Sequence, residues 1–252
     1  MKYLPTIVGA VLGVGVLLLF SGNYNGKQDA IDASIQLGDF CSATVIDDPD
    51  LSDGEQATIL TAKHCVKDKA LGALFDVTTK KYDHGYTILE QTFKFELMSM
   101  SKDADLAILQ TYSTEFWIKP IQVSAYDLDI GDIVYAIGYP LGLQQTITQG
   151  FAGPIMKVPD IDTTSGEFRR STAIITNGNS GGGVFREENG TWRLVGVVSI
   201  GLGKPGVGTF MTGLVPWKEI DAYLKSLEGV LSTDKDIRAH EDAMIASLPW
   251  NQ

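Results

Sequence analysis

The sequence predicts an all-β domain of two packed barrels, followed by a short helix. The chain has 252 residues, a length that suits one domain of this kind. Short apolar runs separated by turn residues recur along it in two sets. Glycine is abundant, with 27 residues, as tight connections between strands require. These three observations favour β-strands throughout the globular part of the chain.

The apolar runs define the two barrels. The first set gives candidate strands at 31–37, 40–47, 56–63, 73–80, 86–97 and 105–111. The second set gives candidate strands at 121–124, 132–139, 146–158, 167–176, 182–187, 191–200 and 207–215. The pair Asn189-Gly190 is a strong hairpin signal within the second set. Barrel one is therefore predicted over about 31–111 and barrel two over about 121–215.

The chain after Pro216 changes to a helical pattern. Trp217, Ile220, Leu224 and Leu227 recur at helical spacing, which predicts a helix over 217–228 with one face on a barrel. The globular domain then covers 25–228. The remaining tail, 229–252, has the composition of a second amphipathic helix, packed on the domain or on a partner.

The N-terminal segment, residues 1–24, has the pattern of a targeting sequence. Lys2 precedes an uncharged apolar run of 17 residues at 4–20, a length between a signal-peptide core and a full membrane span. No good cleavage site follows the run. An uncleaved membrane anchor through residues 4–20 is favoured over a cleaved signal peptide, and either predicts export to the periplasmic or extracellular side.

Composition and pattern argue against several classes of function. Acidic residues outnumber basic ones by 31 to 20, giving a net charge of −11, and such a field repels nucleic acid. The acidic stretch 47–55 has its glycine misplaced for a calcium-binding loop and is predicted to be a solvated hairpin. Residues 201–206 match a dinucleotide fingerprint by letter, but Pro205 interrupts it and a strand follows. Three histidines without ligand spacing argue against zinc, so neither a metal nor an organic cofactor is expected.

The chain is organised around the glycine-rich stretch NGNSGGG at 177–183. Such a backbone can turn sharply and aim two neighbouring N–H groups at one point. Ser180 would then be a nucleophile, with the N–H groups of Gly178 and Ser180 forming an oxyanion hole. Taken alone, the stretch is equally compatible with a glycine-rich hairpin that contains an incidental serine.

Two further motifs supply the partners that a serine nucleophile needs. His64 lies in TAKHC (61–65) at the end of a strand-like run, and Asp105 lies in DADLAIL (103–109) at the start of another. The chain order His64, Asp105, Ser180 is one of the known orders of the Ser-His-Asp triad. His64 is the candidate general base and Asp105 the residue that orients it.

At these three motifs the chain resembles the chymotrypsin-like (trypsin-fold) serine proteases. VYAIGYPLGL at 134–143 and TITQG at 146–150 are similar to the HtrA/DegP-like branch, and the resemblance extends over roughly 38–227. It implies two packed six-stranded antiparallel β-barrels and a serine endopeptidase that cleaves proteins or peptides through an acyl-enzyme. Two departures stand out. The 36 residues after Pro216 are too few for the PDZ domain of that branch, and Asn179 replaces the aspartate that pairs with a newly cut N-terminus in trypsins.

The resemblance also implies a disulfide and a substrate-binding region. Cys41 and Cys65 match a bridged pair beside the histidine, and the alternative is two reduced thiols. Ser199, Ile200 and Gly201 match the substrate-pairing strand, with Gly201 and Gly206 as pocket walls. Ile174 matches the pocket floor, or Ala173 or Ile175 if the alignment slips by one residue. An apolar floor predicts cleavage after apolar residues, because an unpaired cation would be costly to bury there.

Two other functions share these features. One is a catalytically silent, membrane-tethered peptide-binding homologue, which would not require an intact His64, Asp105 and Ser180. The other is an esterase, which the order of the three residues disfavours.

Overall fold

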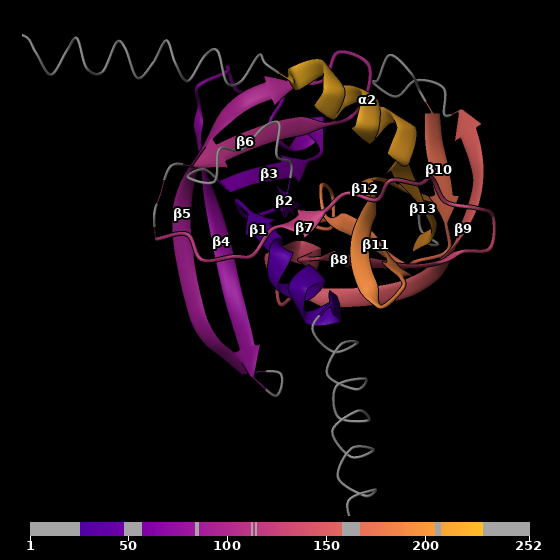
Figure 1. Cartoon of the computed structure of the whole chain (residues 1–252), viewed down its shortest axis with the longest axis horizontal. Helices are drawn as coiled ribbons and strands as arrows, with labels where there is room; N and C mark the ends of the chain where they lie inside the picture. The colour runs from indigo at the N-terminus through magenta and orange to yellow at the C-terminus, as the bar shows by residue number, and fades with distance from the viewer. Residues whose placement is uncertain are drawn as a thin grey trace, which may run out of the picture.

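The computed structural model describes residues 26–47, 57–83, 86–111, 113, 115–157, 167–204 and 208–228. These residues form two β-barrels side by side, with the first barrel formed by β1–β6 and the second by β8–β13 (Figure 1). The predicted fold class is confirmed. The targeting segment 1–24, the acidic stretch 47–55 except Asp47, and the tail 229–252 lie outside the described residues.

The first barrel closes through its two N-terminal strands. Its sheet has the order β1-β4-β5-β6-β3-β2-β7, and an additional β1–β2 pairing joins six of these strands into a ring. All pairings within the ring are antiparallel. The strands are β1 (Ser34–Leu37), β2 (Cys41–Asp47), β3 (Ala57–Thr61), β4 (Leu74–Asp83), β5 (Tyr86–Met100), β6 (Ala107–Thr111) and β7 (Ile121–Gln122).

The second barrel is closed in the order β10-β13-β12-β11-β8-β9. Its pairings are also antiparallel. The strands are β8 (Ile133–Gly138), β9 (Thr146–Lys157), β10 (Glu167–Ser171), β11 (Gly183–Glu188), β12 (Thr191–Lys204) and β13 (Gly208–Pro216). Gly190 has a φ of +81° in the β11–β12 turn, where the Asn-Gly signal predicted a hairpin.

Two elements at the start of the barrels differ from the prediction. The strand expected at 121–124 belongs to the first sheet, because β7 pairs in parallel with β2 and only Val123 bridges to the second barrel. The strand expected at 31–37 begins at Ser34, since residues 26–33 are helical. Ala30 and Ala33 are fully buried at a helical spacing of three, and Ser34 Oγ donates to the Ala30 carbonyl oxygen at 2.9 Å. The small apolar residues of this stretch therefore form the buried face of a helix.

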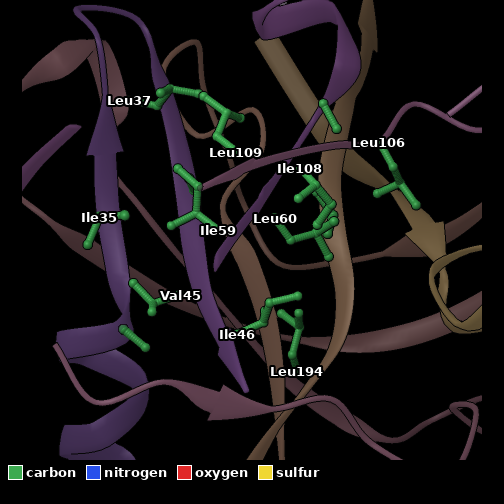
Figure 2. Packing of buried hydrophobic residues seen from close by; sticks show 14 of the residues in the cluster. Ile35, Leu37, Val45, Ile46, Ile59, Leu60, Leu106, Ile108, Leu109 and Leu194 are labelled. Carbon is green, nitrogen blue, oxygen red and sulfur yellow. The ribbon is translucent and has the colours of Figure 1, made fainter. Parts of the chain in front are cut away.

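The buried core runs from one barrel into the other. Figure 2 shows Leu194, which comes from β12 of the second barrel, beside Ile46 of β2, and both belong to one buried cluster with residues of β1, β3 and β6. Leu194 and Ile59 are fully buried, and Ile46 is 2% exposed. A single cluster shared by both barrels fixes their relative position, because its burial from water is lost if they separate.

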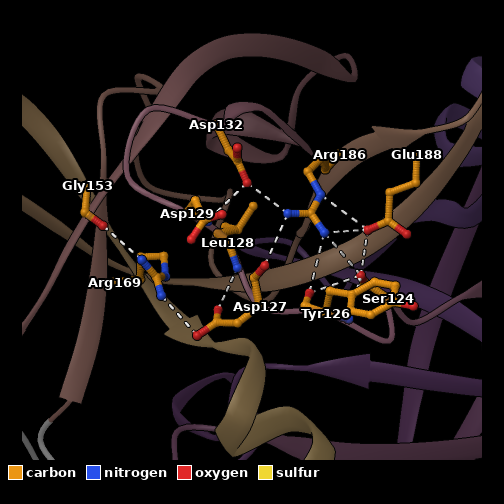
Figure 3. A network of polar contacts seen from close by, with 10 residues as sticks. All are labelled: Ser124, Tyr126, Asp127, Leu128, Asp129, Asp132, Gly153, Arg169, Arg186 and Glu188. Carbon is orange, nitrogen blue, oxygen red and sulfur yellow. Dashed lines mark hydrogen bonds and ion pairs between the residues drawn. The ribbon is translucent and has the colours of Figure 1, made fainter.

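Two arginines tie the connection between the barrels to the second one (Figure 3). Arg186 binds Asp132 at 2.8 Å and Glu188 at 2.6 Å, and Arg169 binds Asp127 at 2.9 Å. Both guanidinium groups also donate to backbone carbonyl oxygens of this barrel or its connection. These charge-assisted bonds order the path of the chain that leads into β8.

The predicted helix is present as α2 (Trp217–Leu227), which lies across the two barrels at the upper edge of Figure 1. Its buried side chains are Ile220, Tyr223, Leu224 and Leu227. The Trp217 indole N–H donates to the Ser124 carbonyl oxygen at 2.6 Å, which fixes the start of the helix. Among the described residues, no helix has the length and apolar character needed to cross a membrane.

Candidate active site

His64 and Asp105 meet as the sequence predicts. His64 sits in a 3₁₀ turn (Lys63–Cys65) directly after β3, and Asp105 precedes β6. Because β3 and β6 are paired antiparallel, the end of one strand lies beside the start of the other. His64 Nδ1 lies 2.7 Å from Asp105 Oδ2, and the His64 backbone N–H donates to Asp105 Oδ1 at 2.9 Å. The imidazole is thereby held in one orientation.

Asp105 is buried, with 5% of its surface exposed, and it accepts a third hydrogen bond. Ser199 Oγ donates to Asp105 Oδ2 at 2.5 Å. Burial alone would raise the pKa of this carboxyl. The hydrogen bond and charge of His64, the Ser199 hydroxyl and the His64 backbone N–H together outweigh burial and hold the pKa below its ordinary value of 3.8. Asp105 is therefore a carboxylate at neutral pH.

The segment before Asp105 is locked by its own polar contacts. Ser101 Oγ accepts the backbone N–H groups of Asp103 and Ala104, at 3.3 and 3.1 Å. Lys63 Nζ donates to the Ser101 carbonyl oxygen at 3.0 Å, which joins this segment to the turn that carries His64. The strand expected from residue 105 starts two residues later, at Ala107, because this tight turn takes up Asp105 and Leu106.

Cys41 and Cys65 are joined in a disulfide, with their Cα atoms 6.2 Å apart. The bridge lies immediately after His64 in the chain. Their sulfur atoms and a ring nitrogen of His64 lie within 4.8 Å of one another, a cluster with the residue types of a metal site. Bridged sulfurs are not thiolates, and the thiolate is the form that binds zinc. The disulfide thus removes two of the three ligands that this cluster could offer.

Ser180 lies in a loop of the second barrel that is held against the turn carrying His64. The Ser180 carbonyl oxygen is 3.6 Å from Cys65 Sγ. The Ser180 side chain is partly exposed, and its hydroxyl makes no hydrogen bond among the described residues. The hydrogen bond between Asp105 and His64 is therefore formed, whereas a hydrogen bond between His64 and the Ser180 hydroxyl is not. Hydrogen bonds of this kind are often long without substrate and tighten in the complex.

Two glycines of this loop have a backbone that only glycine adopts readily. Gly178 has a φ of +98° and Gly181 a φ of +82°. A Cβ on Gly178 would lie 2.4 Å from the Tyr139 carbonyl oxygen, and one on Gly181 would lie 2.1 Å from Thr61 Oγ1. The loop is thus pressed against both barrels at once, which explains the density of glycine around Ser180.

The Gly178 N–H is oriented by the preceding peptide group. The Leu141 N–H donates to the Asn177 carbonyl oxygen at 2.7 Å. Since the N–H and C=O of a trans peptide point in opposite directions, the Gly178 N–H points away from Leu141. Leu141 itself has a φ of +57°, an uncommon conformation for this residue type.

The Ser180 N–H is oriented in the same way. The Gly182 N–H donates to the Asn179 carbonyl oxygen at 2.9 Å, so the Ser180 N–H points to the other side of that peptide. Neither the Gly178 N–H nor the Ser180 N–H donates to an acceptor in the described part of the chain. Buried N–H groups are normally paired, and two free ones flanking a serine can bind an anionic oxygen.

The predicted substrate-pairing strand has a free edge. β13 pairs with one edge of β12 along the strand. The other edge of β12 pairs with β11 only up to Val197. Ser199, Ile200 and Gly201 therefore have no strand partner on the other side within the described residues. An unpaired edge can accept an extended peptide. Gly206, the other predicted pocket wall, lies outside the described residues.

Ile174 lies beyond the end of β10, which stops at Ser171 although a strand was expected to 176. Its side chain is 65% exposed, while Ala173 is fully buried and Ile175 is 6% exposed. The Ala173 N–H donates to Ser171 Oγ at 3.1 Å, and this local bond replaces strand pairing. The predicted floor residue is thus open to solvent in the free protein.

The role of Ser199 was missed in the sequence. It was assigned to the substrate strand alone. In the structure Ser199 is only 4% exposed, and its hydroxyl binds Asp105, which lies 94 residues earlier in the chain. The available signal was a serine inside the apolar run of the predicted strand 191–200. Residue spacing alone cannot indicate a contact between the two barrels.

The family described as trypsin-like peptidase domain matches residues 41–197. This range includes His64, Asp105 and Ser180. The chain belongs to this family.

The curated relatives of this trypsin-like peptidase are HtrA-type serine proteases. It is 29% identical to the serine endoprotease DegS of Escherichia coli over 163 residues, which is 64% of this chain and 41% of DegS. It is 29% identical over 161 residues to the serine protease Do-like HtrB of Bacillus subtilis, covering 62% of this chain and 32% of HtrB. The trypsin-like peptidase described here thus spans less than half the length of these relatives.

Solved structures show the same fold as this trypsin-like peptidase. The HtrA-type protease AlgW with tripeptide superimposes with a TM-score of 0.59 at 19% identity, covering 81% of this chain and 63% of AlgW. The inactive form of the Rv3671c protease gives a TM-score of 0.57 at 20% identity, with coverages of 83% and 94%. At this identity the likeness concerns the fold alone.

Thiol titration of the denatured, unreduced trypsin-like peptidase should find no free cysteine. Closing a loop with a separation of 24 residues should stabilise the fold by about 3.5 kcal/mol on the chain-entropy model. Urea unfolding with and without reductant measures this difference, and the double variant Cys41→Ala, Cys65→Ala should match the reduced protein. Two titratable thiols per chain would contradict the bridge.

Proposed function

We propose that this chain is a serine endopeptidase that hydrolyses peptide bonds through Ser180, His64 and Asp105. Membership of the trypsin-like peptidase family and the HtrA-type relatives support the class of reaction. The observation that carries the proposal is the pair of unbonded N–H groups, on Gly178 and Ser180, in a loop held beside the Asp105–His64 pair.

The mechanism follows from the roles that these residues can fill. Ser180 Oγ attacks the carbonyl carbon of the scissile peptide while His64 Nε2 accepts its proton. Asp105 keeps the other ring nitrogen protonated and stabilises the imidazolium that forms. His64 then protonates the leaving amine, and the acyl group remains on Ser180. A water molecule, deprotonated by His64, hydrolyses this acyl-enzyme and restores the hydroxyl.

The oxyanion formed in both steps would bind the Gly178 and Ser180 N–H groups. Because their peptides are already fixed by Leu141 and Gly182, no reorganisation is needed when the charge develops. The substrate would lie extended along the free edge of β12 at Ser199–Gly201, which presents backbone groups to it.

The preferred residue before the cleaved bond should be apolar. Ile174 and its neighbours Ala173 and Ile175 offer no negative charge to a lysine or arginine side chain, and an apolar side chain gains about 1.5–3 kcal/mol on full burial. Profiling a peptide library should therefore give Val, Leu, Ile, Met or Phe at this position. Dominance of arginine or lysine would overturn the assignment of the pocket.

The working location of the protein would be outside the cytoplasm. The apolar run at 4–20, expected to act as a membrane anchor or signal peptide, and the Cys41–Cys65 disulfide support export. One relative from Haemophilus influenzae is named a probable periplasmic serine protease, at 30% identity over 91 residues.

A fluorophosphonate probe followed by a degradation assay tests the function. The protein should be labelled at Ser180 and should cleave an unfolded protein substrate. A chain that binds peptide without labelling would be the silent homologue. Labelling together with hydrolysis of esters but not of unfolded protein would make it an esterase.

A further inference from the structure

Ser42 makes three hydrogen bonds around the nucleophile loop. Its hydroxyl accepts the Tyr139 backbone N–H at 2.9 Å and donates to the Gly178 carbonyl oxygen at 2.8 Å. Its backbone N–H donates to the Ser180 carbonyl oxygen at 2.8 Å. Ser42 is fully buried, as is Tyr139, and Gly178 is buried as well.

These contacts cross from one barrel to the other. Ser42 is the second residue of β2 in the first barrel, directly after Cys41 of the disulfide. Its partners Tyr139 and Gly178 belong to the second barrel and are 97 and 136 residues further along the chain. One side chain of the first barrel is therefore enclosed by the loop that contains the nucleophile.

With these bonds, every backbone carbonyl oxygen of the loop 177–180 accepts a hydrogen bond. The Asn177 and Asn179 oxygens are bound within the second barrel, by the N–H groups of Leu141 and Gly182, and the other two oxygens are bound by Ser42. In the described part of the chain the Ser42 hydroxyl is the donor bound to the Gly178 oxygen, and the close packing around it excludes solvent.

We propose that Ser42 is a positioning residue. Its hydroxyl fixes the Gly178–Asn179 peptide, which lies between the two peptides that carry the Gly178 and Ser180 N–H groups, and so keeps both groups directed at the substrate. The proposal rests on the proposed function. If the hydroxyl is removed, a buried carbonyl and a buried N–H lose their partner at once, so the loop rotates to find new ones. Such a rotation turns the oxyanion donors away from the substrate and leaves the substrate strand β12 in place.

The test compares Ser42→Ala with a matched variant, Ser34→Ala. Ser34 is also a buried serine of the first barrel, 2% exposed, and its hydroxyl donates one hydrogen bond to the Ala30 carbonyl oxygen at 2.9 Å. That bond is local to the N-terminal helix. Both variants thus remove one buried hydroxyl, and Ser42→Ala alone removes it from the nucleophile loop.

We expect Ser42→Ala to lower kcat on a peptide substrate by about 10- to 100-fold, with KM within about twofold of the wild-type value. Removal of a whole oxyanion donor costs about 10²–10³-fold, and misalignment of one should cost less. Affinity for a peptide boronate, which places an oxygen in the oxyanion hole, should fall by the same factor as kcat/KM. Ser34→Ala should keep kcat within about twofold.

Hydrogen exchange gives a second readout that needs no turnover. The Asn179 and Gly181 N–H groups donate to the Thr176 and Val198 carbonyl oxygens, at 3.1 and 2.8 Å, and report the order of the loop. Both should exchange at least about tenfold faster in Ser42→Ala than in Ser34→Ala. Ser42→Gly, which removes the same hydroxyl, should give the same result if the alanine variant folds poorly.

Three results would overturn the proposal. They are an unchanged kcat in Ser42→Ala, an equal kcat loss in Ser34→Ala, and unchanged exchange in the loop. A wild-type protein that neither labels with fluorophosphonate nor cleaves peptide would instead overturn the proposed function, and the exchange measurement would still decide whether Ser42 orders the loop.

Discussion

Ser180→Ala should lower peptide hydrolysis by about a million-fold while the fold remains intact, because the proposed acyl-enzyme route requires the Ser180 hydroxyl. The residue is partly exposed and its hydroxyl makes no hydrogen bond among the described residues, so its removal breaks no hydrogen bond there. Single-turnover and steady-state hydrolysis measure the loss, and urea unfolding checks the fold.

Ser34→Ala is the control for this variant, since the hydroxyl that it removes donates to the Ala30 carbonyl oxygen and makes no hydrogen bond to the loop. It should retain full labelling by a fluorophosphonate, whereas Ser180→Ala should show none. Proteolysis by Ser180→Ala at more than a few per cent of the wild-type rate would assign the nucleophile to another residue.

Asp105→Asn should lower kcat by about 10⁴-fold, the next largest effect expected. The carboxylate accepts from the ring and the backbone of His64, and an amide in its place can present an N–H to the ring nitrogen. The imidazole would then take the other tautomer and could no longer accept the Ser180 proton. Substrate affinity, measured in the Ser180→Ala background, should stay unchanged, and a kcat loss of less than tenfold would contradict this role.

The same carboxylate should make the stability depend on pH. Its pKa in the folded protein is held below 3.8 by the hydrogen bonds from His64 and Ser199, despite burial. A lowered pKa means stability that is fully present above the ordinary value and is lost as the pH falls through the folded value. The difference in unfolding free energy between Ser180→Ala and Ser180→Ala, Asp105→Asn should therefore shrink as the pH falls below about 4. A difference that persists unchanged at pH 2 would contradict the lowered pKa.

The sequence predicted the Asp105–His64 pair because both residues lie at strand ends. A histidine after one apolar run and an aspartate before another come together once those runs pair antiparallel, as β3 and β6 do. The glycines around Ser180 carried a comparable signal, since positive φ values at Gly178 and Gly181 demand that residue type. In both cases the residue type and its position in a short stretch of sequence were enough to predict the local structure.

Contacts between the barrels could not be predicted in this way. Ser199 and Ser42 look like ordinary buried serines of a strand, and their partners lie about a hundred residues away or more. The last three residues of the helix at 26–33 were mistaken for the start of the strand predicted at 31–37, because so short an overlap shows no period of its own. The length of β10 was overestimated. The Ser171 hydroxyl accepts the Ala173 backbone N–H and ends the strand, and the pattern of apolar residues gives no sign of such a bond.

The hydrogen bonds of Ser42 also bear on how such enzymes can be recombined. The nucleophile loop belongs to one barrel, but part of the surface that shapes it belongs to the other. A chimera that joins the first barrel of one homologue to the second barrel of another would fold each half and still misplace its catalytic loop, unless position 42 and the loop were transferred together. The residues that shape this site thus lie on both sides of the contact between the barrels. An exchange of barrels has to keep matched residues on the two sides.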